Sequence, residues 1–217
     1  MKIKHKFYPK SKEDGELWFM SDLHYNHFHS IRHGNRPFKT LEEMNLYIEK
    51  ELREKINSKD TLFDLGDLFW KIERNKAKEF LTNYIPCSFY KIIGNHDAEN
   101  LWKKDINISP IPKAVGDIFD IHVITSEKKV WNITLSHYPF LTWNRRHYGQ
   151  ANLHGHCHGG IDNYNSLSQE LRIDLSWDGE LAKEAGSFLI PWELIEKKLN
   201  NINKNRSEDK LLINQYL

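Results

Sequence analysis

The sequence predicts an α/β fold built by one domain of 217 residues. Short apolar segments alternate along the chain with amphipathic segments of helical period, which is the pattern of strands alternating with helices. Hydrophobic residues make up 39% of the chain, enough for a folded core, and no repeat or flexible linker divides it. We therefore expect a core over about residues 16–199 and a polar C-terminal tail over about residues 200–217, whose structure the pattern leaves open.

The first half of the chain predicts three strands and two helices. The strands are short runs rich in β-branched and aromatic residues, and they cover residues 16–20, 61–65 and 88–93. The helices cover residues 41–56 and 72–85. Apolar residues four apart share one face of the first helix, and Thr40 with Glu43 forms a capping box at its start. Pro86 ends the second helix.

The second half continues this alternation with shorter elements. A short helix is expected at about residues 99–104, followed by a hairpin over residues 117–139 that turns at residues 127–129. Two further strands are expected, at residues 150–153 and 171–177. A last helix starts at a proline, as helices often do, and covers residues 191–199.

Composition argues against several classes of protein. The chain has 31 Lys and Arg residues against 30 Asp and Glu, so its net charge gives no indication of nucleic acid or an anionic membrane as a partner. No apolar run approaches the ~18 residues that span a bilayer, and no signal peptide is visible. The two cysteines, Cys87 and Cys157, form no disulfide framework and suit a reducing compartment. We therefore expect a cytoplasmic protein.

Five of the predicted strands end directly in residues that bind metals. In chain order the motifs are Asp22-x-His24, Gly66-Asp67, Gly94-Asn95-His96-Asp97, His137 and Gly155-His156-x-His158. Each motif alone is an ordinary turn or loop. Because ligands bind beyond the carboxyl ends of the strands in α/β sheets, five such ends together indicate one site assembled from five loops.

The types of donor indicate the kind of metal. The carboxylate, amide and imidazole groups of these motifs make a mixed oxygen and nitrogen set, which suits Mn, Fe, Ni, Co or Zn better than Ca or Mg. The set is too large for one tetrahedral zinc ion and fits two metals that share a bridging carboxylate.

The order of the motifs resembles that of the calcineurin-like metallophosphoesterases, from about Phe19 to about Leu199. The segments SDLHYNHFHSIRHGNRPF and SHYPFLTWNRRHYGQANLHGHCHG are also similar to a small bacterial and phage subfamily of single-domain enzymes. The resemblance implies a four-layer αββα sandwich of the metallophosphoesterase type, with two mixed sheets flanked by helices and the metals at one edge.

The resemblance also implies a role for each motif residue. One metal would be held by Asp22, His24 and His158, the other by Asn95, His137 and His156, and Asp67 would bridge them. His96 would act on the substrate phosphate as a hydrogen-bond or proton donor, with Asp97 orienting it. The family often has an acidic residue three positions after the bridging aspartate, where this chain has Trp70.

The implied function is a metal-dependent phosphoric ester hydrolase, in which a hydroxide held by two metals attacks phosphorus. Mn²⁺ is the favoured ion, with Fe, Zn, Ni and Co as alternatives. We expect a phosphodiesterase acting on a small, nucleotide-like substrate; the alternatives are a phosphomonoesterase acting on a metabolite or phosphoprotein, and a non-catalytic scaffold on the same fold. Residues expected to contact the substrate are Arg36, Trp143, Arg145 and His27. The oligomeric state is left open.

Overall fold

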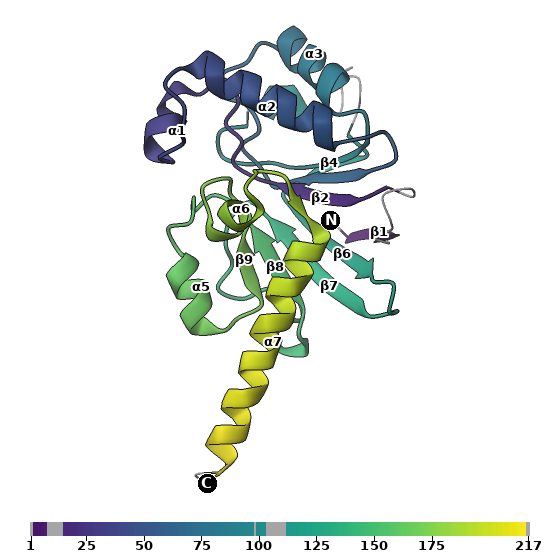
Figure 1. Cartoon of the computed structure of the whole chain (residues 1–217). Helices are drawn as coiled ribbons and strands as arrows, with labels where there is room; N and C mark the ends of the chain where they lie inside the picture. The colour runs from purple at the N-terminus through teal and green to yellow at the C-terminus, as the bar shows by residue number, and fades with distance from the viewer. Residues whose placement is uncertain (1, 8–14, 98, 103–111, 216–217) are drawn as a thin grey trace.

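Two mixed five-stranded sheets form the centre of the molecule, in a computed structural model that describes residues 2–7, 15–97, 99–102 and 112–215 (Figure 1). The first sheet has the order β10-β2-β3-β4-β5 and contains Ile190–Pro191, Leu17–Met20, Thr61–Asp64, Ser88–Ile92 and Ala114–Gly116. The second has the order β1-β6-β7-β8-β9 and contains Lys2–Phe7, Ile118–Ile124, Val130–Ser136, Ala151–His154 and Arg172–Asp174. β2, β3 and β4 run parallel to one another, as do β7, β8 and β9, so their carboxyl ends gather at common edges.

The helices complete the outer layers. They are α1 (Phe28–His33), α2 (Leu41–Lys55), α3 (Arg74–Tyr84), α4 (Glu99–Trp102), α5 (Asp162–Ser168), α6 (Glu180–Ala185) and α7 (Trp192–Gln215). α1, α2 and α3 lie over the first sheet (Figure 1). The predicted capping box is present, because the Thr40 hydroxyl accepts from the Glu43 backbone and the Glu43 carboxylate accepts from the Thr40 backbone.

The main core lies between the two sheets. Phe19 and Phe63 stack from the first sheet with ring centroids 5.4 Å apart, in one cluster with Leu135 and Leu153 of the second. A second cluster joins the other face of the first sheet to α2 and α3, through Met44, Ile48, Leu52 and Leu81 among others. Each fully buried side chain of this size stabilises the fold by about 1.5–3 kcal/mol.

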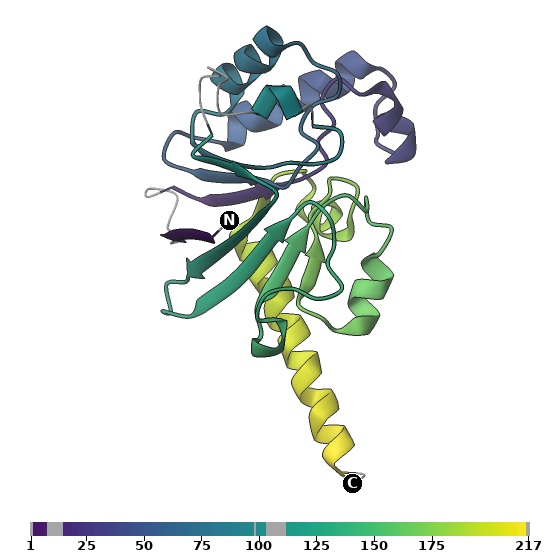
Figure 2. The same ribbon diagram turned by 180° about the vertical axis from the view of Figure 1, so that it is seen from behind.

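The outer face of the second sheet is polar and is covered by a loop and a short helix. The side-chain amide of Asn152 on β8 donates to the Thr134 carbonyl and the Ser136 hydroxyl of β7. From β9, the Arg172 guanidinium donates to the Phe140 carbonyl and to Asn165 of α5. These bonds hold the 138–150 loop and α5 against the sheet. Figure 2 shows the molecule from behind.

The α/β prediction is confirmed, including two mixed sheets flanked by helices. The expected strands agree with the structure to within three residues at each end. The short helix expected at residues 99–104 is observed as α4, and residues 103 and 104 lie outside the described residues. The helix expected at residues 191–199 is longer than predicted, since α7 begins at Trp192 and continues to Gln215 through the segment interpreted as a tail. β1, β5, β10, α1, α5 and α6 were not expected.

In the described part of the chain, no helix combines the length and the apolar character that crossing a membrane requires.

Candidate metal centre

The structure brings the seven expected metal ligands together where the carboxyl ends of strands from the two sheets meet. Loops that follow β2, β3 and β4 carry Asp22, His24, Asp67 and Asn95 from the first sheet. Loops that follow β7 and β8 carry His137, His156 and His158 from the second sheet. The site therefore joins the two halves of the sandwich.

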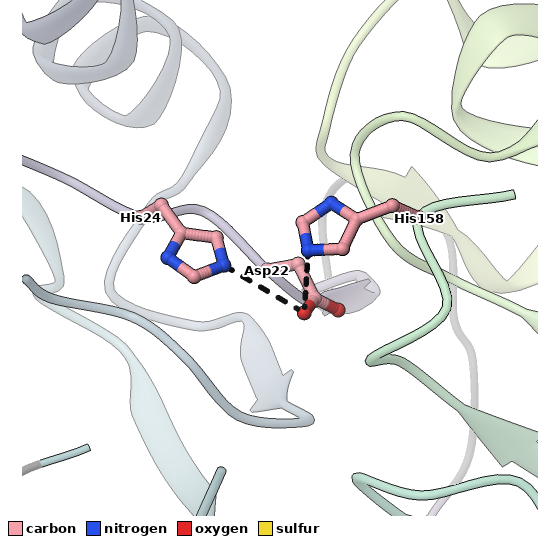
Figure 3. A group of neighbouring side chains, drawn as sticks. All are labelled: Asp22, His24 and His158. Atoms are coloured by element: carbon pink, nitrogen blue, oxygen red, sulfur yellow. Dashed lines mark ion pairs between the residues drawn. The ribbon is translucent and has the colours of Figure 1, made fainter. Parts of the chain in front are cut away.

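The first group of ligands surrounds one carboxylate oxygen. Asp22 is fully buried, and its Oδ1 lies 4.0 Å from His24 Nε2 and 3.5 Å from His158 Nε2. Figure 3 shows both imidazoles turned toward this carboxylate. Oδ1 has no hydrogen-bond partner in the described structure, although its partner oxygen accepts from the Ser21 hydroxyl and the His156 backbone.

The second group shares Asp67 with the first. Asp67 Oδ2 lies 3.6 Å from His24 Nε2 and also 3.6 Å from His137 Nε2. Asn95 Oδ1 lies 3.0 Å from the same His137 nitrogen, and the ring of His156 lies 5.1 Å from that of His137, centroid to centroid. Asp67 thus occupies the position between the two groups that a bridging ligand needs.

Two histidines have the tautomer that metal binding requires. His137 Nδ1 lies 3.0 Å from the Leu65 carbonyl and His158 Nδ1 lies 2.7 Å from the Asp178 carboxylate, so in each the Nδ1–H donates outward. This leaves the Nε2 lone pair of both rings facing the carboxylates. His24 Nδ1 lies 3.2 Å from His27 Nδ1, and its Nε2 also faces the carboxylates.

The backbone of this region is strained. Asp22, His24, Asp67, His156 and His158 have positive φ angles of 56, 52, 57, 69 and 49 degrees. Non-glycine residues in this conformation cost about 1–3 kcal/mol each and persist where the surroundings enforce them, often at functional sites.

The motif glycines are explained by the close approach of neighbouring side chains to their backbone. A Cβ on Gly94 would lie 2.1 Å from Asp67 Oδ1 and a Cβ on Gly66 would lie 2.3 Å from His137 Nδ1.

A buried ion cluster supports the loops that follow β3 and β4. Lys91 on β4 is fully buried, with its Nζ 2.6 Å from both Asp64 and Asp97. Asp97 in turn accepts from the backbone N–H groups of Asp67, Leu68 and Gly94. This corrects the expectation that Asp97 orients His96, because its bonds among the described residues go to Lys91 and to these backbone groups.

Aromatic rings surround the open side of the site. The exposed His96 lies 5.4 Å from His24 and 4.8 Å from Trp70, centroid to centroid. His27 stacks on Trp70 at 3.9 Å and 8 degrees. On the opposite side Tyr138, 48% exposed, lies 4.5 Å from His156. Of the expected substrate contacts, His27 is therefore at the site.

The structure places the other expected substrate contacts differently. Arg36 is buried, donates to both oxygens of Asp178 and to the Asp22 and Leu23 carbonyls, and stacks on Trp177. No donor face of Arg36 is left for a substrate, and it acts instead by fixing Asp178, the partner of His158. Trp143 is also buried and donates to the Gln150 carbonyl, at the end of β8 opposite the His156 loop. Arg145 is exposed in the same 138–150 loop.

The electrostatics of the cluster favour a bound cation. Burial and the neighbouring Asp22 carboxylate raise the pKa of Asp67 to about 6. Burial lowers the pKa of His24 to about 3, so its imidazole is neutral and able to bind metal near neutral pH. Burial also lowers the pKa of His137 and His156, whereas the Asp178 carboxylate raises the pKa of His158 against the effect of burial. Two buried carboxylates with imidazoles around them, and one oxygen without a partner, fit a divalent ion of the transition series.

Sequence reasoning missed two supporting groups. Asp178 follows β9, a further strand end at the same edge, and this position was the signal that could have identified it. The ion pair of Asp64 and Lys91 could not be identified in this way, because both residues lie within strands that were predicted from their apolar residues.

Comparison with known proteins shows the fold and leaves the activity open. No protein-family model matches the chain. An uncharacterized protein of Methanocaldococcus jannaschii is 37% identical over 84 residues, which cover 38% of this chain and 47% of that protein, so the match spans about half of the relative. The crystal structure of a protein of unknown function from Aquifex aeolicus superposes with a TM-score of 0.58 at 20% identity, over 84% of this chain and 98% of that one.

Proposed function

We propose that the protein is a dinuclear metal-dependent phosphoesterase, with the αββα sandwich of the calcineurin-like metallophosphoesterases. One observation carries the proposal. Asp67 Oδ2 lies at equal distance from the Nε2 atoms of His24 and His137, beside the unpartnered Asp22 Oδ1. This is the arrangement expected of a bridging carboxylate between two cation sites.

The residues of this chain divide between two cation positions. Asp22, His24 and His158 would hold one ion, and Asn95, His137 and His156 the other, with Asp67 shared. Two divalent ions there would supply an acidified water as the nucleophile and positive charge for the phosphate oxygens. We favour Mn²⁺ because the donors mix oxygen and nitrogen with no thiolate among them.

His96 is placed to act on the substrate. It is exposed, and its ring lies 5.4 Å from that of His24 and 4.8 Å from that of Trp70, centroid to centroid. Its backbone N–H donates to Asp67 Oδ1, which fixes the start of the side chain relative to the cation positions. We assign it the donation of a hydrogen bond or proton to the leaving oxygen.

The rim of the site supports a nucleotide-like diester as the substrate. Trp70 and His27 form a stacked pair on one side, and Tyr138 stands on the other. Aromatic rings on two sides of a phosphate site favour a planar group attached to the phosphate. These rings would contribute less to the binding of a phosphomonoester, so a phosphomonoester is our second candidate for the substrate.

The test compares hydrolysis of a chromogenic phosphodiester with that of the matching phosphomonoester. Metal-stripped protein receives Mn²⁺, and Asp67→Asn is assayed beside Asp117→Asn, an exposed aspartate outside the site. We expect metal-dependent diester cleavage that is lost with Asp67→Asn and kept with Asp117→Asn.

Two outcomes would count against the proposal. Cleavage that is insensitive to chelator and to Asp67→Asn would show that this cluster does not catalyse it. Failure to bind divalent ions would remove the basis for the reaction. Cleavage of the monoester alone would keep the phosphoesterase and replace the substrate class.

A further inference from the structure

A second cluster of metal-binding side chains lies on the outer face of the second sheet. His154 ends β8 and pairs in register with Asp174, the last residue of the parallel strand β9, so their side chains lie side by side. Cys157 comes back over them from the loop that follows β8. One ligand atom from each of these three residues lies within 4.8 Å of the other two.

Each of the three residues has an atom that can bind a metal ion, and Cys157 is a free, half-buried thiol. His154 Nδ1 lies 2.8 Å from the Gly155 carbonyl, so Nδ1–H donates there and Nε2 keeps its lone pair. Nε2 accepts from the Asn165 amide at 3.4 Å, a long hydrogen bond that a metal ion would replace. Asp174 accepts from the Ser176 backbone and hydroxyl on Oδ1 and from Gly159 on Oδ2. A carboxylate has about four lone-pair sites, so one remains.

The burial of these groups calls for a positive partner. His154 is 0% exposed and Asp174 is 1% exposed. Within the described part of the chain, no ion pair neutralises the Asp174 carboxylate. A buried carboxylate without a cation is costly, and the existing bonds to backbone N–H groups leave its charge only partly compensated.

We propose that His154, Cys157 and Asp174 form a zinc site separate from the Asp22 and Asp67 cluster. Imidazole, thiolate and carboxylate are the three ligand types that zinc takes in proteins, and three protein ligands leave the fourth tetrahedral position to water. The ion would tie the loop that carries His156 and His158 to β9. This inference does not depend on the proposed phosphoesterase activity.

Cobalt provides the test, because Co²⁺ bound by a thiolate absorbs in the near ultraviolet and Co²⁺ bound only by nitrogen and oxygen does not. Metal-stripped protein is titrated with Co²⁺ as wild type, Cys157→Ser and Cys87→Ser. Cys87, the other cysteine, is buried in the core under the helices and serves as the matched control. Asp174→Asn and Asp67→Asn are titrated in parallel, and circular dichroism confirms that each variant is folded.

We expect a thiolate band in the wild type that persists in Cys87→Ser and Asp67→Asn and is lost in Cys157→Ser and Asp174→Asn. Zn²⁺ should displace it, and Cys157→Ser should bind one metal equivalent fewer per chain. Absence of the band from the wild type would overturn the inference. Loss of the band in Asp67→Asn would also overturn it, because Cys157 would then belong to the main cluster.

Discussion

Three of the four histidines of the main cluster have a second residue that holds the ring. His137 is held by a backbone carbonyl and His24 by His27. His158 is held by Asp178, which in turn accepts hydrogen bonds from two nitrogens of Arg36. Such partners set both the orientation and the tautomer of a ligand. Arg36 is the clearest example, since its sequence context indicated a phosphate contact and its burial makes it a supporting residue instead.

The charge state of Asp178 gives a pH-dependent prediction. Burial opposes ionisation, but hydrogen bonds from His158 and Arg36 outweigh it and lower the pKa of Asp178 to about 2, from 3.8. Because the folded value lies below the unfolded one, the carboxylate contributes stability above pH 3.8 that is lost as pH falls through about 2. The contribution at neutral pH is about 2 kcal/mol.

Urea unfolding of metal-free wild type and Asp178→Asn, measured between pH 7 and pH 2, checks this prediction. The difference in unfolding free energy should grow as pH falls from 7 and His158 protonates, because Asp178 raises the pKa of His158, and it should shrink below about pH 4 as Asp178 itself is protonated. A difference that stays constant to pH 2 would show that the Arg36 and His158 contacts do not stabilise the carboxylate. Asp178→Asn should also weaken metal binding by about 10- to 100-fold.

His96 gives a prediction about catalysis. Its imidazole is exposed and does not reach the carboxylates, so His96→Ala should leave metal stoichiometry unchanged while kcat falls by about 10²- to 10⁴-fold. The loss should be smaller for a nitrophenyl leaving group than for an alkyl one, because the former needs less help from a proton donor. Steady-state assays on both esters measure this, with His147→Ala as an exposed histidine control. An equal loss on both esters would assign His96 a binding role instead.

Among the elements, the loops that follow the strands carry the site, and their glycines can be tested. Gly66 has φ +119 degrees, and an added Cβ would lie 2.3 Å from His137 Nδ1. Gly66→Ala must therefore displace the His137 ring or the loop after β3. We expect a loss of at least about 1–3 kcal/mol in unfolding free energy together with weaker metal binding.

Gly186→Ala is the matched control for this change. Gly186 also has a positive φ, +63 degrees, but no atom lies within 4 Å of the added Cβ. It should cost about 1–2 kcal/mol of backbone strain and leave metal affinity, measured by calorimetry, unchanged. If both variants bind metal as the wild type does, the close approach at Gly66 does not position His137.

The longer elements could be predicted from the sequence and the shorter ones could not. α2 and α3 have 15 and 11 residues, enough for a helical period to show, and β2, β3 and β4 are compact apolar runs. β10 has two residues and α1 and α6 have six each, too few for any period to emerge. These elements exist because tertiary contacts form them, as when Ile190 pairs with Phe19 of β2.

In the candidate site, too, the parts that depend on local sequence could be predicted and the parts that depend on tertiary contacts could not. The expected ligands could be located because their motifs follow strand ends, where α/β sheets bind ligands, and the order of the motifs resembles that of a known family. The rim was not, since Trp70 and Tyr138 face His27 and His156 only after five loops have folded together. The α7 extension also escaped prediction, because the segment after residue 199 is polar, and its C-terminal turns extend away from both sheets (Figure 1).

Across the whole molecule, the candidate metal cluster connects the two sheets. Asp22, Asp67 and Asn95 come from the first sheet and His137, His156 and His158 from the second. Ions held by both sets would oppose separation of the sheets. Metal binding should therefore stabilise the entire fold, by about 4 kcal/mol when free metal is ~1,000 times the dissociation constant.

This stabilisation is measured as the rise in melting temperature when Mn²⁺ is added to chelator-treated protein. For a chain of this size, about 4 kcal/mol corresponds to a rise of about 10 °C. Asp67→Asn removes the shared ligand and should lose most of the rise, whereas the exposed Asp117→Asn should keep it. An unchanged rise in Asp67→Asn would mean that Asp67 is not a shared ligand of the ions, and the two-metal arrangement would have to be abandoned.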